Sequence, residues 1–281
     1  TSACDFPARR FFTWALLLPL ALPAYVTAFV WIGLLDFTGP LATWLRESWG
    51  IVQPPPIRTR AGVIAVMTLA LYPYVYLTAR IAFQGQGGRM LEAAQSLGLT
   101  RAQAFWRVAL PMARPGIVAG LLLAVMETLA DFGTVSVFNY NTFTTAIYKA
   151  WFAMFSLPAA SQLASMLIFF VFVAALMESQ LRARRNYAVG GKSGGGAGRI
   201  RLTGGRAALA MAWCGLVFLL AFAVPAWQIG DWAVANFETD FDERYLAFAW
   251  HSLLLSGLGA LLVAALALIL GGLALWPDWL R

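Results

Sequence analysis

Residues 251–275 read HSLLLSGLGALLVAALALILGGLAL, a run of 25 residues that contains no Asp, Glu, Lys or Arg. About 20 apolar residues in a helix cross a hydrocarbon core of about 30 Å, so this stretch predicts a membrane-spanning helix. The whole chain agrees with it, because 60% of its 281 residues are hydrophobic and only 12% are charged. Soluble domains carry about 25% charged residues, so a water-soluble globule is excluded.

Five further stretches are also long and mostly apolar, although Glu127 and Asp131 interrupt the third span. In none of the six do apolar and polar residues alternate. Continuous runs favour helices over the strands of a membrane barrel. The sequence therefore predicts an all-α membrane protein, a polytopic bundle of about six transmembrane helices. The six predicted spans are Phe11–Leu35, Ala61–Phe83, Pro115–Phe138, Ser161–Glu178, Ala207–Ile229 and His251–Leu275.

The basic residues are distributed unevenly between the two sides of these spans. The segments before the first span, between the second and third, and between the fourth and fifth would share one side. Together with Arg80 and Arg281 they hold fifteen of the 20 Lys and Arg residues, and the opposite side holds five. The positive-inside rule then predicts that residues 84–114 and 181–206 are cytoplasmic. A net charge of +7 with this distribution gives no reason to expect a nucleic-acid partner.

The segment 181–206 separates the fourth span from the fifth. It is rich in Gly and carries seven basic residues and no acidic one, which is typical of a flexible linker beside an anionic membrane surface. We expect it to join two membrane halves.

The segment 84–114 has helical propensity but is too polar to cross lipid. Gly98 permits a tight turn in it. Thr100 and Gln103 have the spacing of a capping box that begins a second helix. Pro111 is expected to end that helix and Pro115 to open the third span. The segment is thus predicted to form a helix, a Gly turn and a second helix at the membrane surface.

The same segment matches a known pattern of E-A-A, three residues, G, nine residues, I or V, one residue and L-P. Every spacing is met, at residues Glu92, Ala93, Ala94, Gly98, Val108, Leu110 and Pro111. The chain therefore resembles the permease subunits of binding-protein-dependent ABC importers.

The resemblance implies a mechanism and a set of partners. The loop would dock into a groove on a cytoplasmic ABC ATPase dimer, whose ATP-driven closure would switch the membrane helices between inward-open and outward-open states. A periplasmic solute-binding protein would deliver the solute, and the lipid bilayer would surround the permease in the bacterial inner membrane. The chain itself is then not an enzyme, and no cofactor or metal centre is expected.

Three other stretches are similar to one branch of these importers, the ferric-iron permeases with two fused halves. They are residues 18–26 (LPLALPAYV), 129–135 (LADFGTV) and 141–148 (NTFTTAIY). The resemblance implies ferric iron as the solute. Permeases for polyamine, thiamine or sulfate share the loop and stay as alternatives, and a membrane-embedded enzyme is an alternative of another class.

The order of the spans predicts that the chain is an internal fragment of such a permease. Residues 1–180 would be the last four spans of the first half, residues 181–206 the linker, and residues 207–281 the first two spans of the second half. Two-half permeases carry one docking loop in each half, whereas this chain has one in total.

The acidic residues inside the third span are candidates for the translocation pathway. Glu127 and Asp131 lie four residues apart, on one face of a helix. Charged groups at membrane depth need a cavity or a partner, and a hard cation such as Fe³⁺ prefers oxygen ligands. Pairing with a basic or backbone group for structure is the alternative for both residues, and Asp131 has the further alternative of a position at the outer membrane interface. Pro19 and Pro23 are expected to kink the first span beside the pathway, and a role in packing alone is their alternative.

Overall fold

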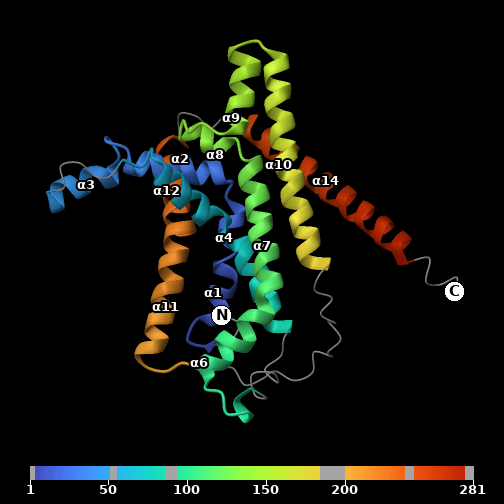
Figure 1. Ribbon diagram of the computed structural model, residues 1–281. Helices are drawn as coiled ribbons and strands as arrows, with labels where there is room; N and C mark the ends of the chain where they lie inside the picture. The colour runs from blue at the N-terminus through green and yellow to red at the C-terminus, as the bar shows by residue number, and fades with distance from the viewer. Residues whose placement is uncertain (1–3, 51–55, 86–93, 184–199, 238–243, 276–281) are drawn as a thin grey trace. The chain divides into compact units, whose positions relative to one another are not determined.

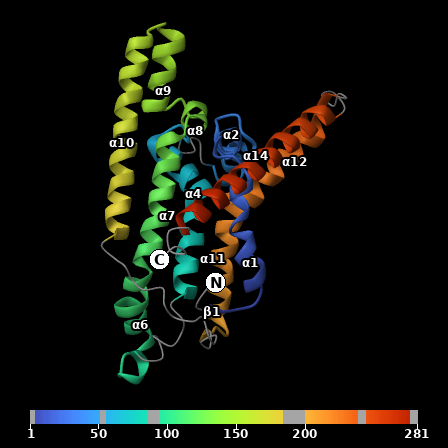
Figure 2. The ribbon, with the colours of Figure 1, turned by 90° about the vertical axis from the view of Figure 1, so that its right-hand side faces the viewer.

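The computed structural model describes residues 4–50, 56–85, 94–183, 200–237 and 244–275. The chain divides into two compact units, Thr1–Gln228 and Ile229–Arg281, and each is described by itself. The first unit, shown in Figures 1 and 2, contains β1 (Cys4–Asp5), α1 (Arg9–Ala15), the 3₁₀ turn η1 (Leu18–Ala21), α2 (Ala24–Leu35), α3 (Pro40–Trp49), α4 (Arg60–Gly85), α6 (Arg101–Ala104), the π segment η2 (Phe105–Ala109), α7 (Leu110–Ala130), α8 (Gly133–Val137), α9 (Phe143–Tyr148), the π segment η3 (Lys149–Ala153), α10 (Leu157–Ala183), β2 (Ile200–Arg201), α11 (Gly205–Phe218) and the π segment η4 (Leu219–Ala223). The helix α12 (Val224–Ala235) crosses the boundary between the units, and α14 (Arg244–Leu275) lies in the second.

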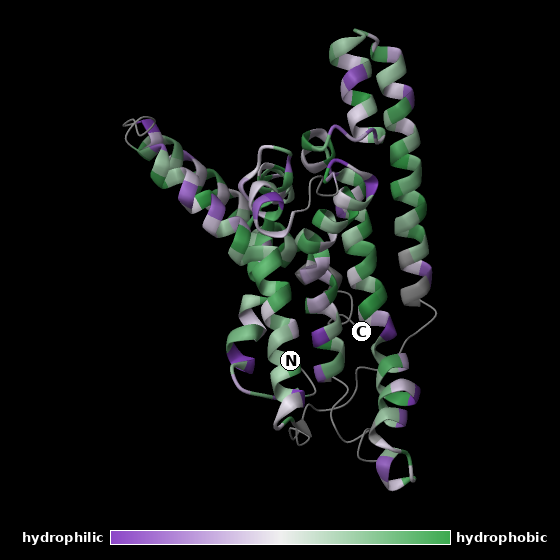
Figure 3. Cartoon of the chain, turned by 90° about the vertical axis from the view of Figure 1, so that its left-hand side faces the viewer, coloured by the Kyte–Doolittle hydropathy of each residue, from purple (hydrophilic) through white to green (hydrophobic). Residues whose placement is uncertain are grey.

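Among the described residues, six helical stretches are long and apolar enough to span a membrane, the number predicted. The first of them is Ala24–Trp49, which combines α2 and α3, and not the predicted Phe11–Leu35. Their apolar character is visible along α7, α10 and α11 in Figure 3. Every side chain described from Arg244 to Gly271 of α14 is exposed. Lipid is the environment in which an apolar helix of this length is stable, because the helix satisfies its own main-chain hydrogen bonds. The polytopic helical fold is therefore confirmed.

The prediction of one continuous helix over residues 11–35 is wrong, because the chain breaks twice there. Pro19 lies in the 3₁₀ turn η1, and Pro23 precedes α2 with extended backbone angles. Leu22 is also extended (φ −101°, ψ 122°), as expected of a residue whose α conformation is hindered by a following proline. Residues 9–35 therefore form three short helical pieces, α1, η1 and α2.

Two tyrosines of α4 donate hydrogen bonds to the main chain of this broken span. The Tyr72 hydroxyl donates to the Leu16 carbonyl at 2.9 Å, and the Tyr76 hydroxyl donates to the Thr13 carbonyl at 3.4 Å. Main-chain groups released from a helix need such partners inside a membrane. Side chains of α4 thus stabilise the interruption between α1 and η1.

The predicted end of the third span at Phe138 is also wrong. The helix α7 ends at Ala130, and Asp131 adopts extended backbone angles (φ −66°, ψ 128°). A separate short helix, α8, then follows. The Asp131 carboxylate accepts hydrogen bonds from the Thr134 hydroxyl (2.9 Å) and the Val135 amide (3.2 Å), which favours a new helix start over continuation of α7.

Of the segment 181–206, the structure describes residues 181–183, which end α10, and residues 200–206. Ile200 and Arg201 pair in parallel with Cys4 and Asp5, and the Leu202 amide donates to the Asp5 carbonyl at 2.8 Å. This end of the predicted linker is therefore attached to the start of the chain. The helix α11 begins at Gly205, two residues before the predicted start of the fifth span.

Candidate functional site

The predicted Gly turn of the loop is present, and its geometry explains why glycine is needed. Gly98 has φ +88°, a conformation that side-chain-bearing residues rarely adopt. Its amide donates to the Gln95 carbonyl at 3.0 Å, and the Leu99 amide donates to the Ala94 carbonyl at 3.1 Å. These two bonds form a Schellman motif, the usual glycine end of a helix. Glu92 and Ala93 lie outside the described residues.

The predicted capping box is confirmed at the start of the next helix. The Thr100 amide donates to the Gln103 side-chain oxygen at 3.0 Å, and the Gln103 amide donates to the Thr100 hydroxyl at 3.3 Å. Free amides at a helix start are satisfied in this way. The turn and the helix that follows it are therefore both well defined by local hydrogen bonds.

This helix does not end at Pro111, contrary to the prediction. The segments α6, η2 and α7 form one uninterrupted helical stretch, from Arg101 to Ala130. Within η2 the hydrogen bonds are of the π type, and the Leu110 amide donates to the Phe105 carbonyl five residues earlier. A π segment widens the helix just before the proline ring, where an α-helical ladder would clash with it.

The surface part of the loop is thereby continuous with a membrane span. Val108 lies inside η2, and Leu110 and Pro111 form the first residues of α7. All three are partly buried. By contrast, Leu97 in the turn is 84% exposed and Trp106 in η2 is 66% exposed. These two side chains give the loop an accessible apolar surface.

A pair of glycines lets α7 approach α4 closely, a feature that our sequence reasoning missed. A Cβ atom on Gly116 would lie 2.6 Å from the Ala82 Cβ, and one on Gly120 would lie 2.7 Å from the Val75 Cα and closer still to the Thr78 hydroxyl. The signal in the sequence was the GxxxG spacing within an apolar helix.

Nearer the loop, the contact between the two helices is aromatic. The rings of Phe83 in α4 and Phe105 in η2 stack with centroids 6.1 Å apart. The views in Figures 1 and 2 both show α7 running beside α4. From Arg101 onward, α6, η2 and α7 are thus one continuous helical stretch that packs against α4.

The two acidic candidates differ in their surroundings. Glu127 is exposed on the last turns of α7. The Asp131 carboxylate instead accepts hydrogen bonds from Thr134 and Val135 in the first turn of α8. The Asp131 carbonyl accepts a hydrogen bond from the Thr144 hydroxyl at 2.7 Å. Thr134, which donates to the carboxylate, is completely buried. Asp131 therefore has a structural role, whatever else it does.

The two prolines of the first span also differ. The Pro19 side chain is fully buried and Pro23 is exposed. Within the part of the chain that the structure describes, no group of three or more His, Cys, Asp or Glu residues lies close enough to hold a metal ion.

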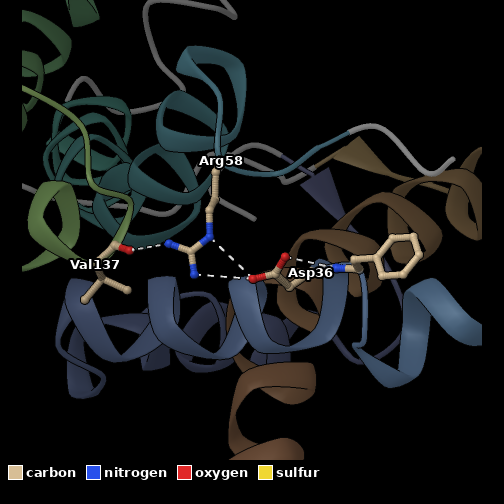
Figure 4. Close-up of polar contacts among 4 residues, drawn as sticks. Asp36, Arg58 and Val137 are labelled. Atoms are coloured by element: carbon tan, nitrogen blue, oxygen red, sulfur yellow. Dashed lines mark hydrogen bonds and ion pairs between the residues drawn. The ribbon is translucent and has the colours of Figure 1, made fainter.

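A polar cluster that the sequence did not predict joins three segments at the end of α4 away from the loop (Figure 4). Nη2 of Arg58 lies 3.3 Å from Oδ2 of Asp36, and Nη1 of Arg58 donates to the Val137 carbonyl at 3.1 Å. Asp36 directly follows α2, Arg58 lies just before α4, and Val137 is the last residue of α8. Beside them, the Arg60 guanidinium donates to the Tyr140 hydroxyl at 3.2 Å.

The chain was compared with known proteins. Residues 5–186 match the family described as "Binding-protein-dependent transport system inner membrane component". The "Fe(3+)-transport system permease protein FbpB 2" of Haemophilus influenzae is 29% identical over 268 residues, which are 94% of this chain and 49% of the relative.

Two further relatives come from Escherichia coli. The "Sulfate transport system permease protein CysT" is 30% identical over 168 residues, 58% of this chain and 59% of the relative. The "Molybdenum transport system permease protein ModB" is 28% identical over 157 residues, 55% of this chain and 67% of the relative. This chain therefore spans about half the length of the iron permease (49%) and somewhat more of the other two.

The family match covers most of the chain, and the six candidate spans provide the membrane-embedded fold that such a component needs. The chain belongs to the family of binding-protein-dependent transport system inner membrane components and is a multi-pass membrane protein.

Proposed function

We propose that the chain is the membrane-spanning part of an ATP-driven importer, coupled to a cytoplasmic ATPase dimer through residues 84–114 and supplied by a periplasmic solute-binding protein. The observation that carries the proposal is the unbroken helix from Arg101 to Ala130, which begins at a rigid Gly turn and continues into a membrane span. The partner ATPase hydrolyses ATP, and the chain has no catalytic role of its own.

The continuous helix between the docked segment and α7 is suited to transmitting a movement of that segment into the membrane. The docked segment would carry Leu97 and Trp106 into a groove on the ATPase, since these are its exposed apolar side chains. Movement of that segment would be passed to α7 along a continuous helix, and to α4 through the close contacts at Gly116 and Gly120. A closely packed helix pair moves as one body, because packed interfaces shift between discrete arrangements rather than deforming.

The required energy is modest. Moving an equilibrium between two states from 1:99 to 99:1 takes a differential interaction of about 5.5 kcal/mol. ATP binding and hydrolysis at the partner supply this difference in the proposed cycle. The membrane-spanning chain then needs two stable arrangements of its helices, one inward-open and one outward-open.

The proposal includes the topology and the organisation in halves. Residues 84–114 and 181–206 would be cytoplasmic, as the excess of Lys and Arg on that side indicates. Residues 1–180 would belong to one permease half and residues 207–281 to the next, with 181–206 as the linker. Alignment with the iron permease supports this organisation because it covers 94% of the chain, across the linker.

Ferric iron is the solute that we propose. The sulfate and molybdenum relatives align over only 58% and 55% of this chain, whereas the iron relative aligns over nearly all of it. Glu127 is the better pathway candidate of the two acidic residues, since its carboxylate is exposed while that of Asp131 is bonded within α8. Sulfate is the second candidate solute, and a molybdenum oxyanion is an outcome of the same test.

The coupling is tested in the complete transporter, assembled with its ATPase and binding protein in proteoliposomes. Gly98→Pro removes the amide that donates to Gln95 and forbids φ +88°. Gly50→Pro is the matched control, because Gly50 ends α3 with φ +62° and donates to the Arg46 carbonyl. We expect uptake and solute-stimulated ATPase activity to fall at least about tenfold in Gly98→Pro only, since docking energy is lost there.

Two results would contradict the proposal. Unchanged uptake in Gly98→Pro, or an equal loss in both variants, would remove the docking role of the loop. For the solute, the same proteoliposomes are assayed with ferric iron, sulfate and molybdate. Uptake of an oxyanion but not of ferric iron would reject iron while leaving the coupling intact.

A further inference from the structure

The helix α3 has two unlike faces. Leu41, Leu45 and Trp49 are spaced by four residues, so they lie along one face of the helix, and Trp44 is three residues from Leu41 and adjoins that face. Thr43, Arg46 and Glu47 form the opposite stripe. Such a division marks a helix that contacts apolar material on one side and water on the other.

The apolar side is only partly covered by protein. Ala42 is completely buried, whereas Trp44 is 52% exposed and Trp49 is 70% exposed. The two indole rings lie near each other, with centroids 6.4 Å apart. Tryptophan is enriched where a membrane meets water, because its ring is apolar and its N–H is polar.

The polar side is bonded to the turn that precedes α3. The Arg46 guanidinium donates to the Phe37 carbonyl at 2.8 Å and to the Thr43 hydroxyl at 3.0 Å, and it stacks over the Phe37 ring at 4.4 Å. The Asp36 carboxylate next to it is held by Arg58 and by the Phe37 amide. These contacts fix the rotation of α3 about its own axis.

The direction of α3 agrees with a position along a membrane surface. In Figure 1, α2 and α3 run across the direction of α7, and Figure 2 shows α2 nearly end-on. A helix perpendicular to a membrane-spanning helix lies parallel to the membrane plane. α3 also leaves directly from α2, at the end of α4 where Arg58 and Asp36 supply charged groups.

We propose that α3 is an interfacial anchor whose apolar side lies in lipid at the membrane surface opposite the docking loop, with Trp44 and Trp49 at the level of the headgroups. Its partner is the lipid surface itself. The anchor sets the depth of Asp36 and Arg58, and through them that of the adjoining ends of α2 and α4. The proposal goes beyond transport and depends only on the membrane location of the chain.

The test uses the full chain in liposomes of bacterial polar lipids, with Cys4→Ser and Cys214→Ser removing the two native thiols. Single cysteines at positions 44, 47, 48 and 49 carry a nitroxide label, and collisions with oxygen and with a polar nickel chelate are measured. Position 169 in α10, where Phe169 is 62% exposed, is the lipid-exposed reference. The ratio of oxygen to nickel collisions should be at least about fivefold higher at 44 and 49 than at 47, since a polar chelate stays in the water phase.

Two outcomes overturn the anchor. High nickel access at all four positions would place α3 in water, and low access of both reagents at 44 and 49 would show that a protein covers it. Neither measurement requires ATPase or solute, so a failure of transport leaves this result unaffected.

Discussion

The closest backbone approach between α7 and α4 makes a quantitative prediction for the variant Gly120→Ala. The added methyl group would lie 2.7 Å from the Val75 Cα and 3.0 Å from the Tyr74 carbonyl, besides its overlap with the Thr78 hydroxyl. Two of these three neighbours are main-chain atoms, so they cannot move without displacing α4. Overpacking of this kind costs about 1–3 kcal/mol.

The matched control is Gly257→Ala in α14. Apart from the neighbouring backbone of α14 itself, no atom of the described residues lies within 4 Å of a Cβ placed on Gly257, so the methyl group meets no obstacle among them. Replacing Gly by Ala inside a helix stabilises it by about 0.5–1 kcal/mol when there is room. The same chemical change should therefore have opposite signs at the two positions, with a difference of about 1.5–4 kcal/mol between the variants.

The assay is unfolding of the purified chain in mixed micelles, followed by far-UV circular dichroism while the mole fraction of denaturing detergent rises. The free energy of unfolding should fall for Gly120→Ala and stay equal or rise for Gly257→Ala. If Gly120→Ala is as stable as the parent chain, the two helices are not in close contact. A loss of equal size in both variants would mean that glycine matters for helix flexibility rather than for packing.

Three further predictions follow from particular hydrogen bonds. Asp131→Ala leaves the buried Thr134 hydroxyl without its acceptor, and it should lower the free energy of unfolding by about 1–3 kcal/mol. The control is Glu127→Gln on the exposed face of α7, which should change the free energy of unfolding by less than about 0.5 kcal/mol. Equal effects in that same unfolding assay would contradict the structural role of Asp131. Thr100→Ala removes the cap of the Gln103 amide, which should exchange hydrogen about fivefold faster in a mass-spectrometric measurement, for a cap worth about 1 kcal/mol. No acceleration would show that the capping bond is not formed. Arg58→Met should lower stability by at most about 1 kcal/mol, because the ion pair with Asp36 is nearly half exposed, and a loss of several kcal/mol in detergent unfolding would mean that the pair is buried.

Much of the helical architecture could be predicted from hydropathy alone. Four predicted spans coincide with observed helices, namely α4, α10, the stretch from α11 to α12, and α14. The boundaries of α4 lie within two residues of the predicted ones, and the other three helices extend several residues beyond the predicted span. Long apolar runs need no tertiary information, because lipid requires each of them to satisfy its own main-chain hydrogen bonds. The Gly turn and the capping box of the loop were equally predictable, since both are formed by residues within five positions of each other.

The errors occurred at prolines and at helix ends, where local rules compete with each other. Pro23 interrupts the first span, yet Pro111 lies inside an unbroken helix. The difference lies in the preceding turn, which is extended at Leu22 but is a π segment before Pro111. A proline rule that considers only the residue itself cannot distinguish these cases.

By itself, the amino-acid sequence determined that this chain is a multi-pass helical membrane protein, how its basic residues divide between the segments that join the spans, and which loop has the family's pattern. These properties depend on composition and short-range spacing. The tertiary structure decided that α6, η2 and α7 form one helical stretch that packs closely on α4, that the Asp131 carboxylate accepts hydrogen bonds from residues of α8, and that Arg58 joins the ends of α2 and α8. These features depend on atoms brought together from distant positions, such as Arg58 and Val137, and short-range spacing carries no information about such contacts.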